Sequence, residues 1–293
     1  MLERGDTVGV VAPGFAVRAQ ALDAGLARLR RMGYRVREGR HLRERHGYLA
    51  GTDRDRAADL AEMLAASEVR AIWFARGGYG TARLLDSVVW RRLRRDPKLL
   101  IGYSDLTALF NPALERGATR CLYGPVVTEL GQAELYHGPS LRRGLAGDPI
   151  RLRFTRRDVV VAGKATGRLI GGNLAVLTHL CGTRFAPDPR GAVLFIEETG
   201  EQTYRIDRML TQLRQAGRLR GLAGVLIGAM EAPQRRRFPP DRDLDTVLRE
   251  FLEPLGVPVI RGVPTGHVRG KWTLPLGAPT YIDSSTRQVR FGS

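Results

Sequence analysis

Residues 102–105 read Gly-Tyr-Ser-Asp, between a short apolar run and the start of a helical pattern. A serine at such a strand-to-helix turn exposes its hydroxyl, and the next backbone N–H points the same way at the positive end of the helix. Ser104 is therefore a candidate nucleophile, and the N–H of Asp105 a candidate oxyanion donor. The alternative is that Ser104 or Asp105 only caps the helix, since Leu106 replaces the second glycine of the pattern Gly-x-Ser-x-Gly.

A serine nucleophile needs a base, which is usually histidine because its pKa lies near neutrality. Four of the five histidines have an ordinary explanation, in a charged stretch, in a weakly patterned segment or on an apolar helix face: His41, His46, His137 and His179. The fifth, His267, follows Gly266 in a loop after a predicted strand. A loop side chain can project into a cleft, so His267 is the preferred base.

An acid would complete the arrangement by orienting the histidine. Glu197 directly follows the apolar residues 193–196, and a buried strand would hold its carboxylate in place. Glu198 and Glu201 are nearby alternatives, and charge pairing with Arg205 or Arg208 on the next helix explains them equally well. The sequence therefore favours Glu197.

The elements that must position these residues alternate along the chain. Apolar runs predict strands at 7–12, 34–36, 69–75 and 99–101, and helical patterns at 21–32 and 52–66 separate them. This order predicts a parallel, doubly wound sheet, in which ligands lie beyond the carboxyl ends of the strands. Ser104 and the turn RGGYG at 76–80 both follow such ends.

The second half predicts a smaller mixed α/β domain. We expect strands at 166–170, 193–196 and 224–229, helices at 173–180, 204–215 and 244–251, and short antiparallel strands at the end. Between the halves the pattern weakens into polar and arginine-rich stretches. The predicted organisation is an N-terminal α/β domain at 1–130, a linker at 131–164 and a C-terminal α/β domain at 165–293.

The chain has a net charge of +17, from 47 basic and 30 acidic residues. All but three of the basic residues are arginines, many beside acids, and this pattern is more typical of genome composition than of a phosphate-tracking surface. Nucleic acid is therefore not an expected partner. The two cysteines lie in apolar settings and favour the cytoplasm, and no run approaches the ~20 apolar residues of a membrane helix.

Competing cofactor motifs are weak. The stretch RGGYGTA lacks the spacing of a dinucleotide turn, and no P-loop lysine is present. His41, Glu44 and His46 lack an evident further ligand. We therefore expect neither a cofactor nor a metal ion. The turn Gly171-Gly172-Asn173 can cap a helix or approach a ligand with bare backbone.

Five segments together resemble the serine LD-carboxypeptidases, the murein tetrapeptide carboxypeptidases. They span nearly the whole chain in order: RGGYGTARLL (76–85), GYSDLTAL (102–109), GGNLAVL (171–177), FIEETGEQTYRIDRMLTQL (195–213) and GHVRGKWTLPLGA (266–278). The resemblance implies Ser104 as nucleophile, Glu197 as acid and His267 as base. It also implies backbone oxyanion donors, here Asp105 and a glycine of RGGYG, for which Gly78 is preferred.

The resemblance further implies the architecture and the reaction. The expected fold is a flavodoxin- or amidotransferase-like parallel sheet domain plus a small swivelling β/α/β barrel-like domain, with the triad assembled across the cleft between them. Members remove a terminal D-alanine from cytoplasmic muropeptides in cell-wall recycling, need no metal and are typically homodimers. Arg76 is the expected clamp for the substrate carboxylate, and Tyr79 and Asn173 are expected substrate contacts.

One departure and two alternatives accompany this prediction. Family members often read Ala-Pro-Ser-Gly after the first strand, whereas this chain has Gly14 and Phe15 at the last two positions. The first alternative is the microcin C self-immunity branch, which cleaves aminoacyl-nucleotide toxins with the same triad. It should favour an aromatic platform near His267, for which Trp272 is the candidate. The second alternative is a basic α/β binding module without catalysis.

Overall fold

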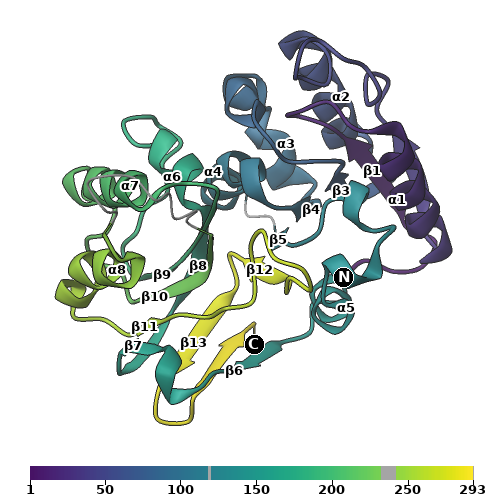
Figure 1. Cartoon of the computed structure of the whole chain (residues 1–293). Coiled ribbons are helices and arrows are strands. Elements are labelled where there is room, and N and C mark those ends of the chain that lie inside the picture. Colours follow the sequence, from purple (N-terminus) through teal and green to yellow (C-terminus); the bar gives the residue numbers. More distant parts are fainter. Residues whose placement is uncertain (118–119, 232–241, 293) are drawn as a thin grey trace. The chain divides into compact units, whose positions relative to one another are not determined.

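The computed structural model describes residues 1–117, 120–231 and 242–292. The chain divides into two compact units, one formed by Met1–Asp148 and Arg269–Gly277, the other by Pro149–Val268 and Ala278–Ser293. Each unit is built on one sheet, of six strands in the first and eight in the second (Figure 1). The expected two-part α/β fold is confirmed.

The first sheet has the strand order β12-β5-β4-β3-β1-β2. Its five neighbouring strands from β5 to β2 are parallel, and β12 pairs with β5 in the antiparallel sense. The strands are β1 (Thr7–Val11), β2 (Arg35–Glu38), β3 (Val69–Phe74), β4 (Leu99–Gly102), β5 (Cys121–Tyr123) and β12 (Leu274–Leu276). The predicted doubly wound parallel sheet is therefore present.

The helices of the first unit follow from local sequence. Helix α1 (Ala19–Arg31) buries one face, which includes Leu22, Leu26 and Leu29. Thr52 caps α2 (Asp53–Ala65) through a capping box with Asp55. The remaining helices are α3 (Trp90–Arg95), α4 (Thr107–Gly117) and α5 (Gly138–Ala146), with 3₁₀ turns at Thr81–Ser87, Ser104–Leu106, Val127–Glu129 and Ala133–Leu135.

The second sheet has the order β6-β14-β13-β8-β9-β10-β11-β7. Strands β8 (Lys164–Asn173), β9 (Ala192–Thr199), β10 (Gly224–Glu231) and β11 (Val259–Ile260) are parallel. The flanking antiparallel strands are β6 (Ile150–Arg153), β7 (Val159–Val161), β13 (Pro279–Asp283) and β14 (Gln288–Phe291). The helices are α6 (Leu174–His179), α7 (Thr203–Gln215) and α8 (Leu244–Leu252), with 3₁₀ turns at Arg156–Asp158 and Glu253–Leu255.

The boundaries in the structure differ from those expected at 130 and 164. The segment 131–164 carries α5, whose Leu141 and Leu145 join the core of the first unit, and then β6 and β7 of the second sheet. The stretch Arg269–Gly277 belongs to the first unit and contributes β12 to its sheet. Strands β6, β7 and β12 have only three or four residues each, so their apolar patterns are too short to be recognised.

Among the described residues, no helix combines the length and apolar character required to cross a bilayer.

Candidate functional site

Ser104 stands in an unusual backbone conformation. Strand β4 ends at Gly102, a 3₁₀ turn begins at Ser104, and α4 follows from Thr107. The φ angle of Ser104 is 66°, and Arg287 is the only other described non-glycine residue with a positive φ. A left-handed conformation costs a residue with a Cβ about 1–2 kcal/mol, so the surrounding structure must enforce it. This is the backbone geometry of a nucleophile elbow.

Two residues lie close to the serine turn, Tyr123 and Gly77. The backbone N–H of Ser104 donates to the hydroxyl of Tyr123 on β5 at 3.1 Å. A Cβ added at Gly77 would lie 3.0 Å from the Cβ of Ser104, so a side chain at position 77 would displace the turn RGGYG from the serine. Sequence reasoning missed both residues. The doubled glycine signalled the close approach, whereas nothing local to Tyr123 indicated its role.

Gly78 follows this contact directly. Its φ is 108°, and among the described residues its backbone N–H makes no hydrogen bond. The ring of Phe15 lies against it, because a Cβ at Gly78 would come within 2.4 Å of that ring. Gly78, the expected oxyanion donor, thus directly follows Gly77, the glycine next to Ser104. The role of Gly78 stays a prediction.

The carboxylate of Asp105 joins the two turns. It is buried and accepts hydrogen bonds from the backbone N–H and hydroxyl of Thr81, at 2.9 and 2.6 Å. Burial raises the pKa of Asp105, although the bonds from Thr81 act in the opposite direction. The 3₁₀ turn begins after Tyr103 without a side-chain cap. The carboxylate of Asp105 therefore fastens this turn to Thr81.

Gly14, which stands where family members often have serine, lies close to the carboxylate of Asp105. A Cβ at this position would lie 2.9 Å from Oδ2 of Asp105 and 3.1 Å from the carbonyl oxygen of Tyr79. The glycine therefore lets the turn after β1 approach the Asp105–Thr81 contact. Phe15, next in the chain, lies 5.4 Å from the Arg76 guanidinium, measured to the ring centroid.

The acid and the base lie together in the second unit. Oε2 of Glu197, near the carboxyl end of β9, is 2.8 Å from Nδ1 of His267. The glutamate side chain is fully buried, and the imidazole is 23% exposed. Gly266 has a φ of 120°, and a Cβ there would lie 2.7 Å from the same carboxylate oxygen. A carboxylate bound at Nδ1 makes Nε2 the nitrogen that can take up a proton.

Asn173 supports this pair from the end of β8. Its amide nitrogen donates to Oε1 of Glu197 at 3.4 Å and to Oε1 of Glu198 at 3.1 Å. Its amide oxygen caps α6 by accepting from the N–H of Val176. Asn173 is only 5% exposed. Asn173 thus hydrogen-bonds both carboxylates and the start of α6, and its expected contact with substrate stays a prediction.

Glu198 and Glu201 have different surroundings. Glu198 accepts from the N–H groups of Ala175 and Thr199, at 2.8 and 2.9 Å, and burial raises its pKa. The expected alternative of a solvated pair with an arginine of the next helix is therefore wrong for Glu198, because its oxygens face backbone donors. Glu201 does form that pair, with Arg205 at 3.2 Å.

The two other expected substrate contacts lie on the turn after β3. One guanidinium nitrogen of Arg76 donates to the carbonyl oxygen of Ala16 at 2.9 Å. Tyr79 is 43% exposed, with its ring 6.1 Å from that of Tyr48. Both residues flank Gly77 and Gly78, and their contact with substrate stays a prediction.

The remaining histidines lie elsewhere. His179 is exposed at the end of α6, so its expected core position is wrong: Leu174 and Leu177 occupy the buried face. The ring of His137 stacks on Trp272 in the first unit, with centroids 4.5 Å apart, and burial lowers the pKa of His137. Trp272 therefore contacts His137 through this stack.

His41 has a neighbour that sequence spacing did not reveal. Its Nδ1 lies 2.8 Å from Glu44, and this contact raises the pKa of His41. Asp55 of α2 completes a group of three whose ligand-type atoms lie within 4.8 Å of one another. Nothing in the local sequence indicated this third residue, because Asp55 lies eleven positions after Glu44. Asp55 is also bound to Thr52 in the capping box, so its carboxylate already has a structural role.

Comparisons with known proteins place these residues in context. Residues 8–124 match the LD-carboxypeptidase N-terminal domain, and residues 166–282 the LD-carboxypeptidase C-terminal domain. The chain is 35% identical to the "probable murein peptide carboxypeptidase" of Bacillus subtilis, over 98% of this chain and 91% of that protein.

Two solved structures have the same architecture. The muramoyltetrapeptide carboxypeptidase from Oxalobacter formigenes is 28% identical and superposes with a TM-score of 0.89, over 98% of this chain and 99% of that one. An MccF-like protein from Bacillus anthracis is 24% identical, with a TM-score of 0.87 over 100% of this chain and 98% of that one. The second likeness shows the fold alone.

Proposed function

Because the chain belongs to the LD-carboxypeptidase family and is therefore a hydrolase of the carboxypeptidase class, we propose that it removes the terminal D-alanine from murein tetrapeptides by serine catalysis. The nucleophile is Ser104, the base His267 and the orienting acid Glu197. The observation that carries the proposal is the φ of 66° at Ser104, because strain in a serine at a strand-to-helix turn is characteristic of a nucleophile elbow.

The proposed reaction is an acyl transfer in two steps. Nε2 of His267 takes the proton from the hydroxyl of Ser104 as Oγ attacks the carbonyl carbon of the scissile bond. His267 then gives this proton to the nitrogen of the leaving D-alanine. In the second step water loses a proton to His267 and attacks the acyl carbon. The bond from that carbon to Oγ breaks as His267 returns the proton to Oγ, which releases the shortened peptide and restores the Ser104 hydroxyl.

Glu197 acts through His267. Its buried carboxylate at Nδ1 stabilises the imidazolium that exists while the histidine holds the extra proton, and it fixes the ring orientation. The N–H groups of Asp105 and Gly78 are the proposed donors to the oxyanion of the tetrahedral intermediate. Neutral backbone donors that are already oriented stabilise this developing charge without reorganisation.

The proposed substrate ends in a free carboxylate, which a guanidinium can bind in bidentate fashion. Arg76 is the proposed clamp, with Tyr79 and Asn173 as further contacts. We further propose that the enzyme is cytoplasmic and forms a homodimer. Its proposed role is in cell-wall recycling. Family membership favours catalysis over the alternative of a binding module.

The decisive experiment incubates the purified chain with a murein tetrapeptide and measures the released alanine by chiral chromatography, which detects both enantiomers. A tetrapeptide that ends in L-alanine and the Ser104→Ala variant are the controls. Release from the natural peptide by the unmodified chain alone supports the proposal. An aminoacyl sulfamoyl adenylate is tested in parallel. Cleavage of that compound without D-alanine release would establish the microcin-immunity alternative and overturn the murein one.

A further inference from the structure

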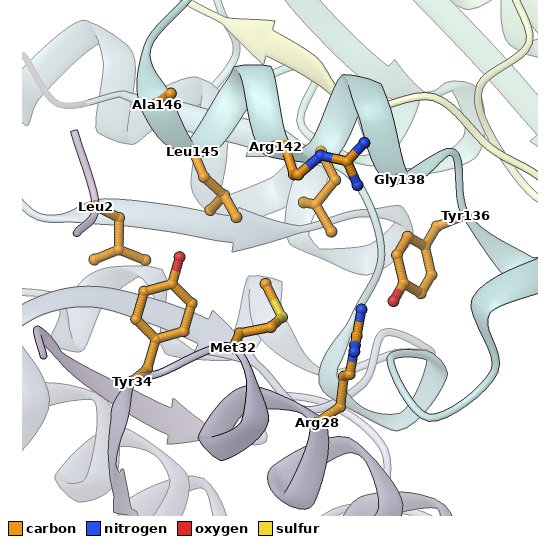
Figure 2. A pocket seen from close by; sticks show the side chains of 10 residues that line it. Leu2, Arg28, Met32, Tyr34, Tyr136, Gly138, Arg142, Leu145 and Ala146 are labelled. Carbon is orange, nitrogen blue, oxygen red and sulfur yellow. The ribbon is translucent and has the colours of Figure 1, made fainter. Parts of the chain in front are cut away.

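A pocket of about 260 Å³ opens in the first unit between α1, α5 and the N-terminal residues. Figure 2 shows the side chains that line it. Its apolar wall is formed by Leu2, Met32, Leu141 and Leu145. None of these residues belongs to the proposed catalytic groups, and the pocket has no role in the reaction proposed above.

Two arginines line the same pocket, Arg28 from the last turn of α1 and Arg142 from α5. In the view of Figure 2 both guanidinium groups lie on the side of Tyr136, and Leu2 and Tyr34 lie on the opposite side. Among the described residues neither arginine forms an ion pair with an acid. Two uncompensated guanidinium groups beside an apolar wall favour an anion with an apolar part.

The walls are held by backbone and side-chain hydrogen bonds. The N–H of Leu2 donates to the carbonyl oxygen of Leu145 at 3.0 Å, which fastens the N-terminus to α5. The hydroxyl of Tyr136 donates to the carbonyl oxygen of Leu130 at 3.4 Å. Burial raises the pKa of Tyr34, so its phenol remains a neutral donor at the pocket. The pocket is therefore preformed, as small-molecule sites usually are.

We propose that this pocket binds a small amphipathic organic anion. Its carboxylate or phosphate group lies between Arg28 and Arg142, and its apolar body, about one ring in size, packs against Met32 and Leu141. The volume of about 260 Å³ is slightly below the roughly 300 Å³ at which drug-sized pockets begin, so the ligand is a small metabolite. A bare inorganic ion would leave the apolar wall in water, and a neutral ring would leave both cations unpaired.

The binding test uses calorimetric titration with two probes, phenyl phosphate and benzoate, which distinguish a phosphate from a carboxylate head group. Inorganic phosphate and benzyl alcohol are the controls, because each carries only one half of the proposed ligand. We expect saturable 1:1 binding of at least one probe, at least tenfold tighter than that of either control. Equal binding of a control, or no saturable binding of either probe, overturns the proposal.

Variants test the residues. Arg28→Gln and Arg142→Gln should each weaken probe binding about tenfold, which corresponds to ~1.4 kcal/mol. Arg31→Gln removes the same charge from an exposed position on α1 and should leave the affinity unchanged. Thermal melting checks that all three variants fold. If binding survives in the Arg28→Gln/Arg142→Gln double variant, the proposal is wrong. D-alanine release is measured in a separate assay. A failure of probe binding at the pocket can therefore be told apart from a failure of the proposed carboxypeptidase activity.

Discussion

Oε2 of Glu197 lies 2.8 Å from Nδ1 of His267, and the carboxylate is fully buried while the imidazole reaches solvent. A buried anion in contact with an imidazole stabilises the protonated ring. The second carboxylate oxygen accepts from Asn173 at 3.4 Å, which restricts rotation of the acid. The two residues are 70 positions apart in the chain, and the fold brings them into direct contact.

Replacement of Glu197 by glutamine should lower kcat for D-alanine release by about 10²–10⁴-fold, because the imidazolium loses its counter-charge and the ring its preferred tautomer. KM should change little, since Glu197 is not proposed to touch substrate. Glu201→Gln is the matched control: it removes a carboxylate four residues away that is paired with Arg205. Steady-state kinetics of both variants check this, and equal activity of the two would contradict the role of Glu197.

Substitutions at Ser104 separate chemistry from backbone strain. Ser104→Ala and Ser104→Gly both remove the hydroxyl, so each should lower D-alanine release by at least 10³-fold. The glycine variant should nevertheless be more stable than the alanine variant by about 1 kcal/mol, because the φ of 66° is strained for alanine and not for glycine. Urea denaturation measures the difference. Equal stability would mean that Ser104 is not held in the left-handed region.

Gly266→Ala should disrupt the acid–base pair. The new Cβ would lie 2.7 Å from Oε2 of Glu197, so the loop that carries His267 must shift. Because a displacement of about 1 Å costs roughly 10²-fold in rate, we expect kcat to fall by at least that factor. Gly256→Ala is the control, since Gly256 also has a positive φ, 65°, but open space around the added methyl group. An activity loss of the same size in both variants would refute the steric explanation.

The buried carboxylate of Asp105 should make stability depend on pH. Its pKa is raised in the folded state, so the folded chain binds more protons than the unfolded one just above the ordinary Asp pKa of about 3.9. Stability is therefore lost as pH rises from about 4 through the folded pKa. Asp105→Asn removes this dependence and keeps an oxygen for Thr81.

Urea denaturation at pH 3, 5 and 7 measures this effect. The free energy of unfolding of the unmodified chain, relative to that of the Asp105→Asn variant, should fall as pH rises. A relative stability that is constant or rises over this range would show that burial does not control the ionisation of Asp105.

The order of strands and helices could be predicted because it depends on local patterns. Continuous apolar runs marked β1 and β3, and Thr52 marked the start of α2. Further apolar runs predicted that Ser104 follows the end of a strand, as it does after β4, whereas β9 continues to Thr199, two residues beyond Glu197. The sequence could not show that Arg269–Gly277 joins the first unit, because β12 is only three residues long and its partner β5 lies far away in the chain.

Sequence by itself determined the family, the fold class and the candidates Ser104, Glu197 and His267, because residue types and their spacing along a strand or loop carry that information. Tertiary structure alone decided the strained backbone of Ser104, its bond to Tyr123 and the pairing of Glu197 with His267. These depend on strand order and register, which bring residues from distant positions together. A hydrogen bond or a forbidden Cβ contact exists only after that folding, so no local pattern reports it.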